Sequence, residues 1–391
     1  MKPFIAERIK SVQPFLGRVM FEKARALESR GEKLIHFELG EPDFDTPEHI
    51  KEAAKKALDE GYTHYAPNAG LLELREAIAE KLKRENNIDV DPLTQICVTA
   101  GSQEAAFLAI MCTIDNGDEV LITDPSYYTY RNCVEMAGGK PIFVPLKEED
   151  NFRLNPENIE RKITPRSKMI IINSPCNPTG GVITKEDLEA IDEIAIKHDL
   201  LVLSDEIYEK IVYNGQKHFS IAALSREPDR ILTVNGFSKA YAMTGWRVGY
   251  IVASKNIISE VVKMQQSAMS SVTTFAQKGA IAALRGPQDP LLNMIKEFER
   301  RREVIINGLK EIEGFFVDKP KGAFYAFVNV KKLGKSSLQI SDFLLKEAKV
   351  VTTPGIAFGT NGEGYIRISY ATSIENIKEG IYRIKKAIEK L

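Results

Sequence analysis

The chain has 391 residues, of which 43% are hydrophobic and 27% are charged, and its formal net charge is −1. This length is enough for a substantial core and favours two domains, or one large and one small domain. A net charge near zero gives no bulk attraction to nucleic acid or to anionic membranes, so we expect neither as a partner.

The cysteines, the histidines and the N-terminus indicate the cellular compartment and whether the protein binds a metal. The four cysteines form no CxxC pair, which favours buried free thiols in a reducing compartment, and the five histidines show no metal-ligand spacing. We therefore expect no metal. The N-terminus, MKPFIAERIKSVQ, carries charges where a signal peptide needs an apolar core, and no apolar run approaches the about 18 residues of a membrane span. These features predict a soluble, cytoplasmic protein.

In chain order, helical periodicity appears at 48–61 and 71–85, and further helices then alternate with seven short apolar segments up to about residue 285. The segments are rich in β-branched residues and apolar on both faces, as strands covered on both sides are. TKED at 184–187 fits a capping box that opens the helix before the fifth segment. We predict an α/β fold with a mostly parallel seven-stranded sheet between helices. Its strands are QICVTA (95–100), EVLIT (119–123), PIFVP (141–145), KMIIIN (168–173), LLVLS (200–204), RILTVN (230–235) and GYIVA (249–253).

The pattern changes after about residue 285. A long charged helix at about 289–312 is followed by alternating strands and helices, with AFYAFVN, KVVTT and YIRISY as the strands. This order predicts a smaller α+β domain, and a cleft between two domains is a favoured place for a small-molecule site. We expect an N-terminal arm and part of the small domain at 1–45, a large domain at 46–286 and the small C-terminal domain at 287–391.

Polar and aromatic residues follow five of the predicted strands. Ligands of a mostly parallel open sheet bind beyond the carboxyl ends of its strands, so these residues are expected to meet. Each has an ordinary explanation, because such turns and aspartates are commonly caps and a loop lysine is usually solvated. Their convergence on one edge instead favours a ligand site. The residues are Gly101, Ser102 and Gln103 after the first strand, Tyr127 after the second, Asn177 in NPTG, Asp205 with Tyr208 in DEIY, and Ser238 with Lys239.

The stretch SKAYAMTGWRVGY (238–250) resembles the lysine motif of the class I/II family of pyridoxal-phosphate aminotransferases, of fold type I. NPTG (177–180), DEIY (205–208) and YIRISYA (365–371) stand in the order that the family has, and the resemblance spans nearly the whole chain. Through GEPDFDTP and THYAPNAG the sequence is most similar to archaeal and bacterial aspartate/aromatic aminotransferases.

This resemblance implies pyridoxal 5′-phosphate as the cofactor and Lys239, Asp205 and Tyr208 as catalytic residues. Lys239 is expected to form a Schiff base with the cofactor aldehyde and later to move the substrate's α-proton, which near neutral pH requires a pKa lowered by desolvation and nearby cations. Asp205 is expected to keep the pyridine nitrogen protonated. Tyr208 and Asn177 are expected to hydrogen-bond the phenolic oxygen, while Tyr127 stacks on the ring.

The resemblance also implies a cup for the cofactor phosphate at a helix start, where the dipole favours an anion. Tyr65 matches a tyrosine that reaches the phosphate of the neighbouring subunit, which implies a homodimer with shared active sites. The cup is formed by the turn at Gly101, the backbone N–H groups of Ser102 and Gln103, and the side chains of Ser238 and Arg247.

For the substrate, Arg367 matches the arginine that binds the α-carboxylate in a bidentate manner, with Asn177 beside it, and Gly40 lets backbone approach the same group. An exposed strand arginine is the alternative explanation for Arg367. One branch of the family binds a distal carboxylate through a lysine, and here Met111 stands at that place. Arg18 in PFLGRVM is the candidate for this role, although a solvated arginine on an amphipathic helix gives the same pattern.

Together these residues predict a ping-pong aminotransferase that takes aspartate, an aromatic amino acid or both as donor, with 2-oxoglutarate as acceptor. A β-C–S lyase of the same fold shares the lysine and the aspartate and is the alternative among enzymes. A non-catalytic effector-binding module is less favoured, because such regulators need a DNA-binding domain and only about 40 residues precede GEPDFDTP.

Overall fold

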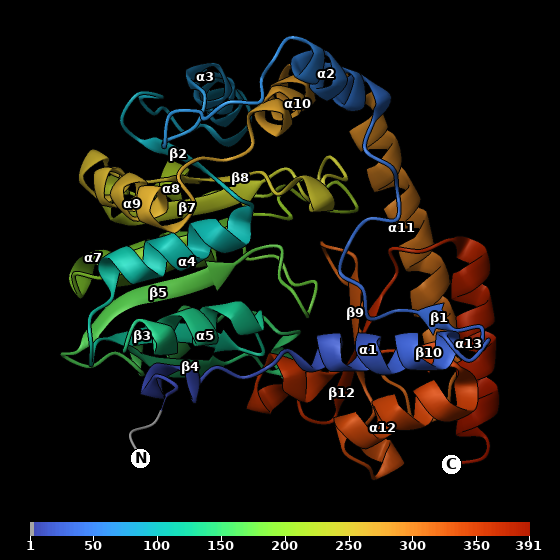
Figure 1. The fold of residues 1–391 in the computed structure, drawn as a ribbon. Coiled ribbons are helices and arrows are strands. Elements are labelled where there is room, and N and C mark those ends of the chain that lie inside the picture. Colours follow the sequence, from blue (N-terminus) through green and yellow to red (C-terminus); the bar gives the residue numbers. More distant parts are fainter. Residues whose placement is uncertain (1–3) are drawn as a thin grey trace.

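The centre of the molecule is a seven-stranded sheet with the strand order β2-β8-β7-β6-β5-β3-β4, seen in a computed structural model that describes residues 4–391 (Figure 1). Only β8 runs antiparallel to its neighbours. The predicted α/β fold with a mostly parallel seven-stranded sheet is confirmed. Its strands are β2 (Ile96–Thr99), β3 (Glu119–Asp124), β4 (Lys140–Pro145), β5 (Ser167–Asn173), β6 (Leu201–Asp205), β7 (Ile231–Gly236) and β8 (Gly249–Val252).

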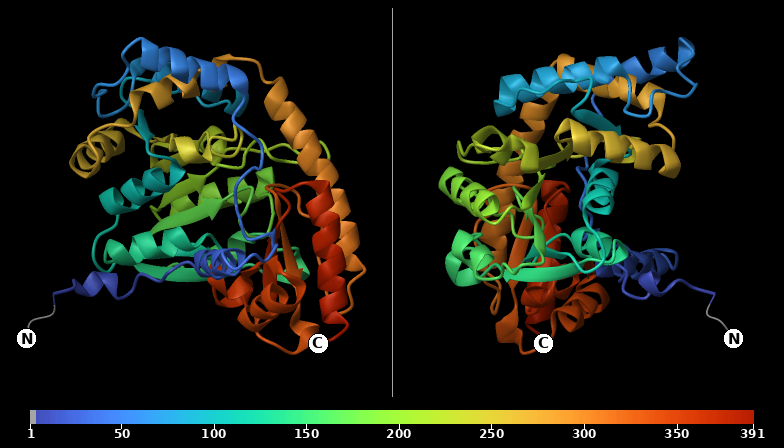
Figure 2. Two further views of the ribbon diagram at one scale, coloured as in Figure 1. Left: turned by 45° about the vertical axis from the view of Figure 1, so that its right-hand side comes forward. Right: turned by 90° about the vertical axis from the view of Figure 1, so that its left-hand side faces the viewer.

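Helices cover both faces of this sheet, which explains why its strands are apolar on both sides. In β5, Ile170 and Ile172 enter one core, whereas Ile171 enters the core on the opposite face. The first face is covered by α6 (Pro156–Glu160), α7 (Lys185–Lys197) and α8 (Ile221–Leu224), and the second by α4 (Ser102–Thr113), α5 (Tyr128–Met136) and α9 (Lys255–Ala268). Beyond β2 lie α2 (Glu48–Asp59), α3 (Leu72–Lys81) and α10 (Thr274–Arg285) (Figures 1 and 2).

The start of α7 differs from the predicted capping box. Thr184 is the N-cap residue, and its hydroxyl accepts a hydrogen bond from the backbone N–H of Asp187 at 3.2 Å. The Asp187 carboxylate accepts from Arg153 Nε at 2.8 Å instead of turning back to the cap. Because Asp187 pairs with Arg153, it does not accept the second hydrogen bond of a capping box, from the backbone N–H of Thr184. Thr184 therefore caps the helix through one hydrogen bond only.

A smaller part is built from both ends of the chain. The 22-residue helix α11 leads into an antiparallel sheet of order β11-β12-β9, and β1 pairs in parallel with β10. Met20 and Ala24 of α1 pack on Leu345 and Val351, which fixes the N-terminal helix to the C-terminal part (Figure 1). The domain limits at 45 and 286 stay a prediction. The elements are α1 (Leu16–Glu28), β1 (Ile35–His36), α11 (Asp289–Lys310), β9 (Tyr325–Asn329), α12 (Ser337–Phe343), β10 (Val350–Val351), β11 (Thr353–Pro354), β12 (Tyr365–Ser369) and α13 (Ile374–Ile388).

Two further features bear on the sequence analysis. Within residues 4–391, no helix combines the length and the hydropathy needed to cross a bilayer. The four cysteines are free, and three of them are buried, as the apolar segments around them predict.

Candidate active site

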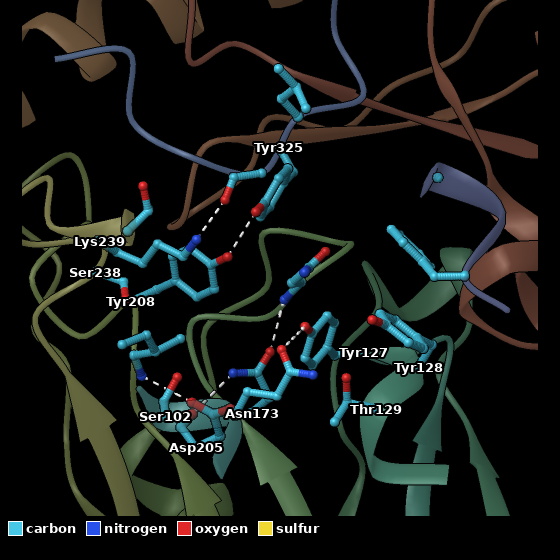
Figure 3. Close-up of a pocket in the computed structure, with 18 of the residues that line it drawn as sticks. Ser102, Tyr127, Tyr128, Thr129, Asn173, Asp205, Tyr208, Ser238, Lys239 and Tyr325 are labelled. Carbon is cyan, nitrogen blue, oxygen red and sulfur yellow. Dashed lines mark hydrogen bonds between the residues drawn. The ribbon is translucent and has the colours of Figure 1, made fainter. Parts of the chain in front are cut away.

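A cavity of about 280 Å³ lies where the carboxyl ends of the central strands meet β9 and β12, near the lower end of the size range of small-ligand sites (Figure 3). The structure brings most of the predicted site residues together here, from segments up to about 350 positions apart in the sequence. Those that line the cavity are Arg18, Gly40, Ser102, Gln103, Tyr127, Asn177, Asp205, Tyr208, Ser238, Lys239, Arg247 and Arg367.

Lys239 follows β7 and extends into the cavity, where its Nζ donates to the backbone oxygen of Gly40 at 2.5 Å. Burial lowers the pKa of this lysine to about 8, from 10.5. The Glu41 carboxylate opposes the shift, while the positive charges of Arg367 and Arg247 add to it. The neutral amine that a nucleophile or a base requires is therefore still the minor form near neutral pH, but it is far more abundant than for an ordinary lysine.

Asp205 is the last residue of β6, and its carboxylate is buried below the lysine (Figure 3). Tyr130 Oη donates to Oδ2 at 2.6 Å, and the backbone N–H of Ile207 donates to Oδ1 at 3.1 Å. Burial raises the pKa of Asp205 from 3.8 to about 6, against the two hydrogen bonds, which lower it. At neutral pH the site thus holds a buried negative charge that a cationic ligand group would neutralise.

The start of α4 forms a cradle for an anion. Gly101 is the N-cap residue at φ +85°, a conformation that favours glycine, and no side chain caps the helix. A Cβ atom at Gly101 would collide with the guanidinium group of Arg247, and one at Gly249 would collide with the backbone at Ser102. Arg247 is fixed there, because it donates to Ala100 O at 3.1 Å and to Thr244 O at 3.0 Å. The free N–H groups and this cation suit a phosphate.

Arg367, on β12, faces the same cavity and is almost fully buried, which excludes the exposed strand arginine. Its guanidinium donates to Asn177 Oδ1 at 2.9 Å and to Glu38 O at 2.6 Å, and lies 4.4 Å from the Tyr325 ring centroid. Within the described part of the chain, its Nε atom has no hydrogen-bond partner. An unsatisfied buried donor of this kind favours binding of a carboxylate.

Comparison with known proteins agrees with this geometry. The sequence pattern of the family described as aminotransferase class I and II matches residues 32–384. The chain belongs to this family. It is a pyridoxal-phosphate-dependent aminotransferase, which moves an amino group from an amino acid to a 2-oxo acid.

The aminotransferase is similar over nearly its whole length to aminotransferases of archaea and bacteria. It is 46% identical over 387 residues to aromatic-amino-acid aminotransferase 2 of Thermococcus litoralis, and 47% identical over 386 residues to the aspartate aminotransferase of Pyrococcus abyssi; each alignment covers 98% of both chains. The solved structure of the Thermus thermophilus aspartate aminotransferase with maleate matches with a TM-score of 0.93 and 38% identity, covering 98% of this chain and 100% of that one.

Other predicted residues of the aminotransferase lie at or outside the cavity rim. Arg18 reaches the rim with a side chain that is 69% exposed, and its contact with Glu22 is long, at 3.7 Å. Tyr65 is 90% exposed and lies outside the cavity of its own chain. Met111, which stands at the place of the family's lysine, is also outside, because only the first turns of α4 reach the cavity.

Several residues that line the cavity of the aminotransferase were not predicted from the sequence, among them Tyr130, Asn173 and Tyr325. Tyr208 and Tyr325 share a hydrogen bond of 2.7 Å, and a Cβ at Gly40 would lie 2.7 Å from the Tyr325 hydroxyl (Figure 3). Asn173 Oδ1 accepts from the backbone N–H of Asn177 and thereby orders the NPTG turn. The available signal for Asn173 was a polar residue that ends an apolar strand. For Tyr130 and Tyr325 it was their place in the aromatic-rich stretches SYYTY (126–130) and AFYAF (323–327).

One group of possible metal ligands lies behind the site of the aminotransferase. Glu206, Glu209 and His218 have ligand atoms within 4.8 Å of one another. Their carboxylates already have partners, since Lys81 pairs with Glu209 and Ser220 donates to Glu206 at 2.7 Å. The lysine ammonium supplies the positive charge that a metal ion would bring, so we assign no metal to this group.

Proposed function

We propose that this aminotransferase uses aspartate, aromatic amino acids or both as donors and 2-oxoglutarate as acceptor. The names of its relatives in Thermococcus and Pyrococcus support both donor classes. The observation that carries the proposal is the buried Arg367, which lines the cavity that Lys239 enters and whose Nε has no hydrogen-bond partner among the described residues. An α-carboxylate held there brings the α-carbon of an amino acid toward the lysine amine.

The charged, polar and aromatic groups that line the cavity match the chemical groups of pyridoxal 5′-phosphate. The uncapped start of α4, with Gly101, Ser102 and Gln103, together with Ser238 and Arg247, is assigned to the phosphate. Asp205 is assigned to the pyridine nitrogen, Tyr208 and Asn177 to the phenolic oxygen, and Tyr127 to the ring face. When bound, the cofactor supplies an aldehyde that takes up amino groups and a ring that withdraws electrons.

The roles of the chain's own groups follow from their charge states. Lys239 Nζ, whose lowered pKa makes the neutral amine more abundant than in an ordinary lysine, would hold the cofactor and would then take the α-proton of the substrate. The buried charge of Asp205 holds a proton on the ring nitrogen, because separating that pair would leave an uncompensated charge in the interior. Arg367 orients the substrate by holding its α-carboxylate.

The distal carboxylate of a dicarboxylic substrate is assigned to Arg18. Its guanidinium lies 4.9 Å from the Phe21 ring centroid at the cavity rim, and its only ion pair within the described residues is the long contact with Glu22. It can therefore turn to a carboxylate without breaking a strong contact. Without such a partner, binding of a dicarboxylate would be weakened by the desolvation cost of its unpaired second carboxylate.

The proposal is tested by Arg18→Ala in assays of oxo-acid product and of glutamate formed from 2-oxoglutarate. We expect kcat/KM for aspartate to fall by about 10–100-fold, on the order of 1.4–2.7 kcal/mol for a lost charged contact, with phenylalanine unchanged. Arg25→Ala is the matched control, because Arg25 lies on the same helix with the same 69% side-chain exposure. Equal losses for both substrates would contradict the assignment, and pyruvate and ammonia released without an oxo-acid acceptor would indicate a lyase.

The proposal also covers the oligomeric state, the cellular location and the domain limits. We assign a homodimer in which Tyr65 reaches the partner's phosphate site, a role that its 90% exposure in the single chain supports. We assign the cytoplasm as location, supported by free cysteines. We also propose domain limits at 45 and 286, supported by the pairing of β1 with β10 and by the start of α11 at Asp289.

A further inference from the structure

Aromatic rings from three distant segments pack against one another beside the cavity, and the rings of two of these segments line it. Phe15, the residue before α1, stacks on Tyr128 with ring centroids 4.3 Å apart and planes 10° from parallel. Phe15 also meets Phe358 edge-on at 5.8 Å, and Tyr128 meets Tyr127 edge-on at 5.0 Å. The rings therefore form a continuous wall from Tyr127 to Phe358, in which Phe15, Tyr127 and Tyr128 line the cavity and Phe358 is buried next to Phe15 (Tyr127 and Tyr128 in Figure 3).

The two ends of this wall coincide with the two groups that hold the reactants. Tyr127 is the ring assigned to stack on the cofactor, and the Phe358 centroid lies 4.9 Å from the Arg367 guanidinium. An amino acid bound between these ends has its side chain along the middle of the wall, where Phe15 and Tyr128 lie. Both rings line the cavity and both are only partly buried, so their surfaces are open to a ligand.

We propose that Phe15, fixed on Tyr128, is a specificity-determining residue that binds the flat apolar side chain of an aromatic amino acid. This inference rests on the proposed function and names the part of the site that selects one donor class. Aromatic rings attract one another in stacked and edge-on arrangements, and burying a ring between them removes a large apolar area from water. A short carboxylate side chain, such as that of aspartate, has no apolar ring to bury against this wall, so the wall does not stabilise its binding.

Gly17 provides the space that the Phe15 ring occupies. A Cβ atom at Gly17 would lie 2.7 Å from Cζ and 3.2 Å from Cδ1 of that ring. Any side chain at position 17 therefore forces the Phe15 ring out of this position. Arg18 follows directly and reaches the same cavity, so adjacent residues of one segment present a ring for aromatic donors and a cation for dicarboxylates.

The inference predicts a change in selectivity for Phe15→Ala in the holoenzyme. We expect kcat/KM for phenylalanine to fall by about 10–100-fold, the range for loss of a buried aromatic contact, while kcat/KM for aspartate changes by less than about threefold. Gly17→Ala is expected to shift the ratio in the same direction, because it displaces the ring without removing it. Phe316→Ala is the control, since Phe316 is an exposed aromatic residue outside the cavity.

A binding measurement separates this subsite from the chemistry. Calorimetry with 3-phenylpropionate and with maleate is expected to show weaker binding of the first ligand only, by a similar factor, in Phe15→Ala. Equal losses for both donors and both ligands would show that Phe15 merely holds α1 in place, and no loss for either would show that the wall does not touch substrate; each result overturns the inference. Absence of transamination in the wild type would instead refute the proposed function, whatever the calorimetry shows.

Discussion

Asp205 and Lys239 are two ionisable residues whose charged forms are disfavoured by burial as long as the site holds no ligand. Burial raises the pKa of the acid to about 6 and lowers that of the lysine to about 8. Both shifts show that the interior disfavours the charged form of each group. Residues under such constraint are typical of functional sites, where a ligand supplies the missing compensation.

The acid gives a stability prediction whose sign can be worked out. The pKa of Asp205 is 3.8 in the unfolded chain and about 6 in the folded chain, so the cost of burying its charge is fully present above pH 6 and absent below about 3.8. We expect Asp205→Asn to raise the free energy of unfolding of the cofactor-free protein at pH 7 by roughly 1–3 kcal/mol, since one pKa unit corresponds to about 1.4 kcal/mol. Urea unfolding at pH 7 and at pH 4 measures the difference, which should largely vanish at pH 4.

The same variant should lose activity although it gains stability. Asparagine keeps an oxygen for the Tyr130 hydroxyl, but it brings no charge to hold a proton on the ring nitrogen. Turnover of the holoenzyme is expected to fall by about 100-fold or more, as for loss of a preorganised electrostatic contact. A less stable cofactor-free variant, or one with wild-type turnover, would contradict the assignment of Asp205.

At the scale of elements, the contact between β3 and the turn at 355–362 connects the two parts of the molecule. Asp124, the last residue of β3, accepts from Thr360 Oγ1 at 2.9 Å and from Asn361 Nδ2 at 2.9 Å. Nearby, the backbone N–H of Ser126 donates to Phe358 O at 2.8 Å. These bonds fix Phe358 beside the guanidinium of Arg367, so a carboxylate at the end of a strand positions a substrate-binding group on another sheet.

We therefore expect Asp124→Ala to act on substrate binding through Phe358. The change removes a buried carboxylate together with its hydrogen bonds to Thr360 and Asn361, and it should lower the free energy of unfolding by roughly 1–3 kcal/mol, the range for hydrogen bonds to a charged group. It should also raise KM for every amino-acid donor, while Asp124→Asn, which keeps an acceptor, should restore part of the loss. Denaturant unfolding and steady-state kinetics measure the two effects. An unchanged KM in a destabilised Asp124→Ala protein would show that the contact is only structural.

The elements were largely predictable because the signals that determine them are local. All seven strands of the large sheet could be found from short runs of β-branched residues, and the motif around Lys239 locates the edge where the ligand binds. Contacts between distant segments were not predictable in this way. Tyr130 lies 75 positions from Asp205, and Phe15 meets Tyr128 across more than 100 positions, so no local pattern records either pair.

On the scale of the whole molecule, the exposed Tyr65 predicts that a complete site requires two chains. Mixing Lys239→Ala protein with Tyr65→Ala protein should form hybrid dimers in which one site has both defects and the other has neither. We expect activity above the sum of the parents once the subunits have exchanged. A mixture of Lys239→Ala with Asp205→Ala is the matched control, since both residues serve their own chain and no intact site can form. Failure of the first mixture to gain activity despite proven exchange would show that Tyr65 does not act across the interface.

The attachment of the cofactor to Lys239 is the central claim, and reduction with borohydride tests it most directly. The protein is incubated with pyridoxal 5′-phosphate, reduced, digested and mapped by mass spectrometry. Because Lys239 combines a lowered pKa with a place inside the cavity, we predict that one equivalent of the cofactor is fixed on this lysine and that Lys239→Ala protein stays unlabelled in the cavity. Stoichiometric label on any other lysine, or retention of full labelling in the variant, would contradict the account.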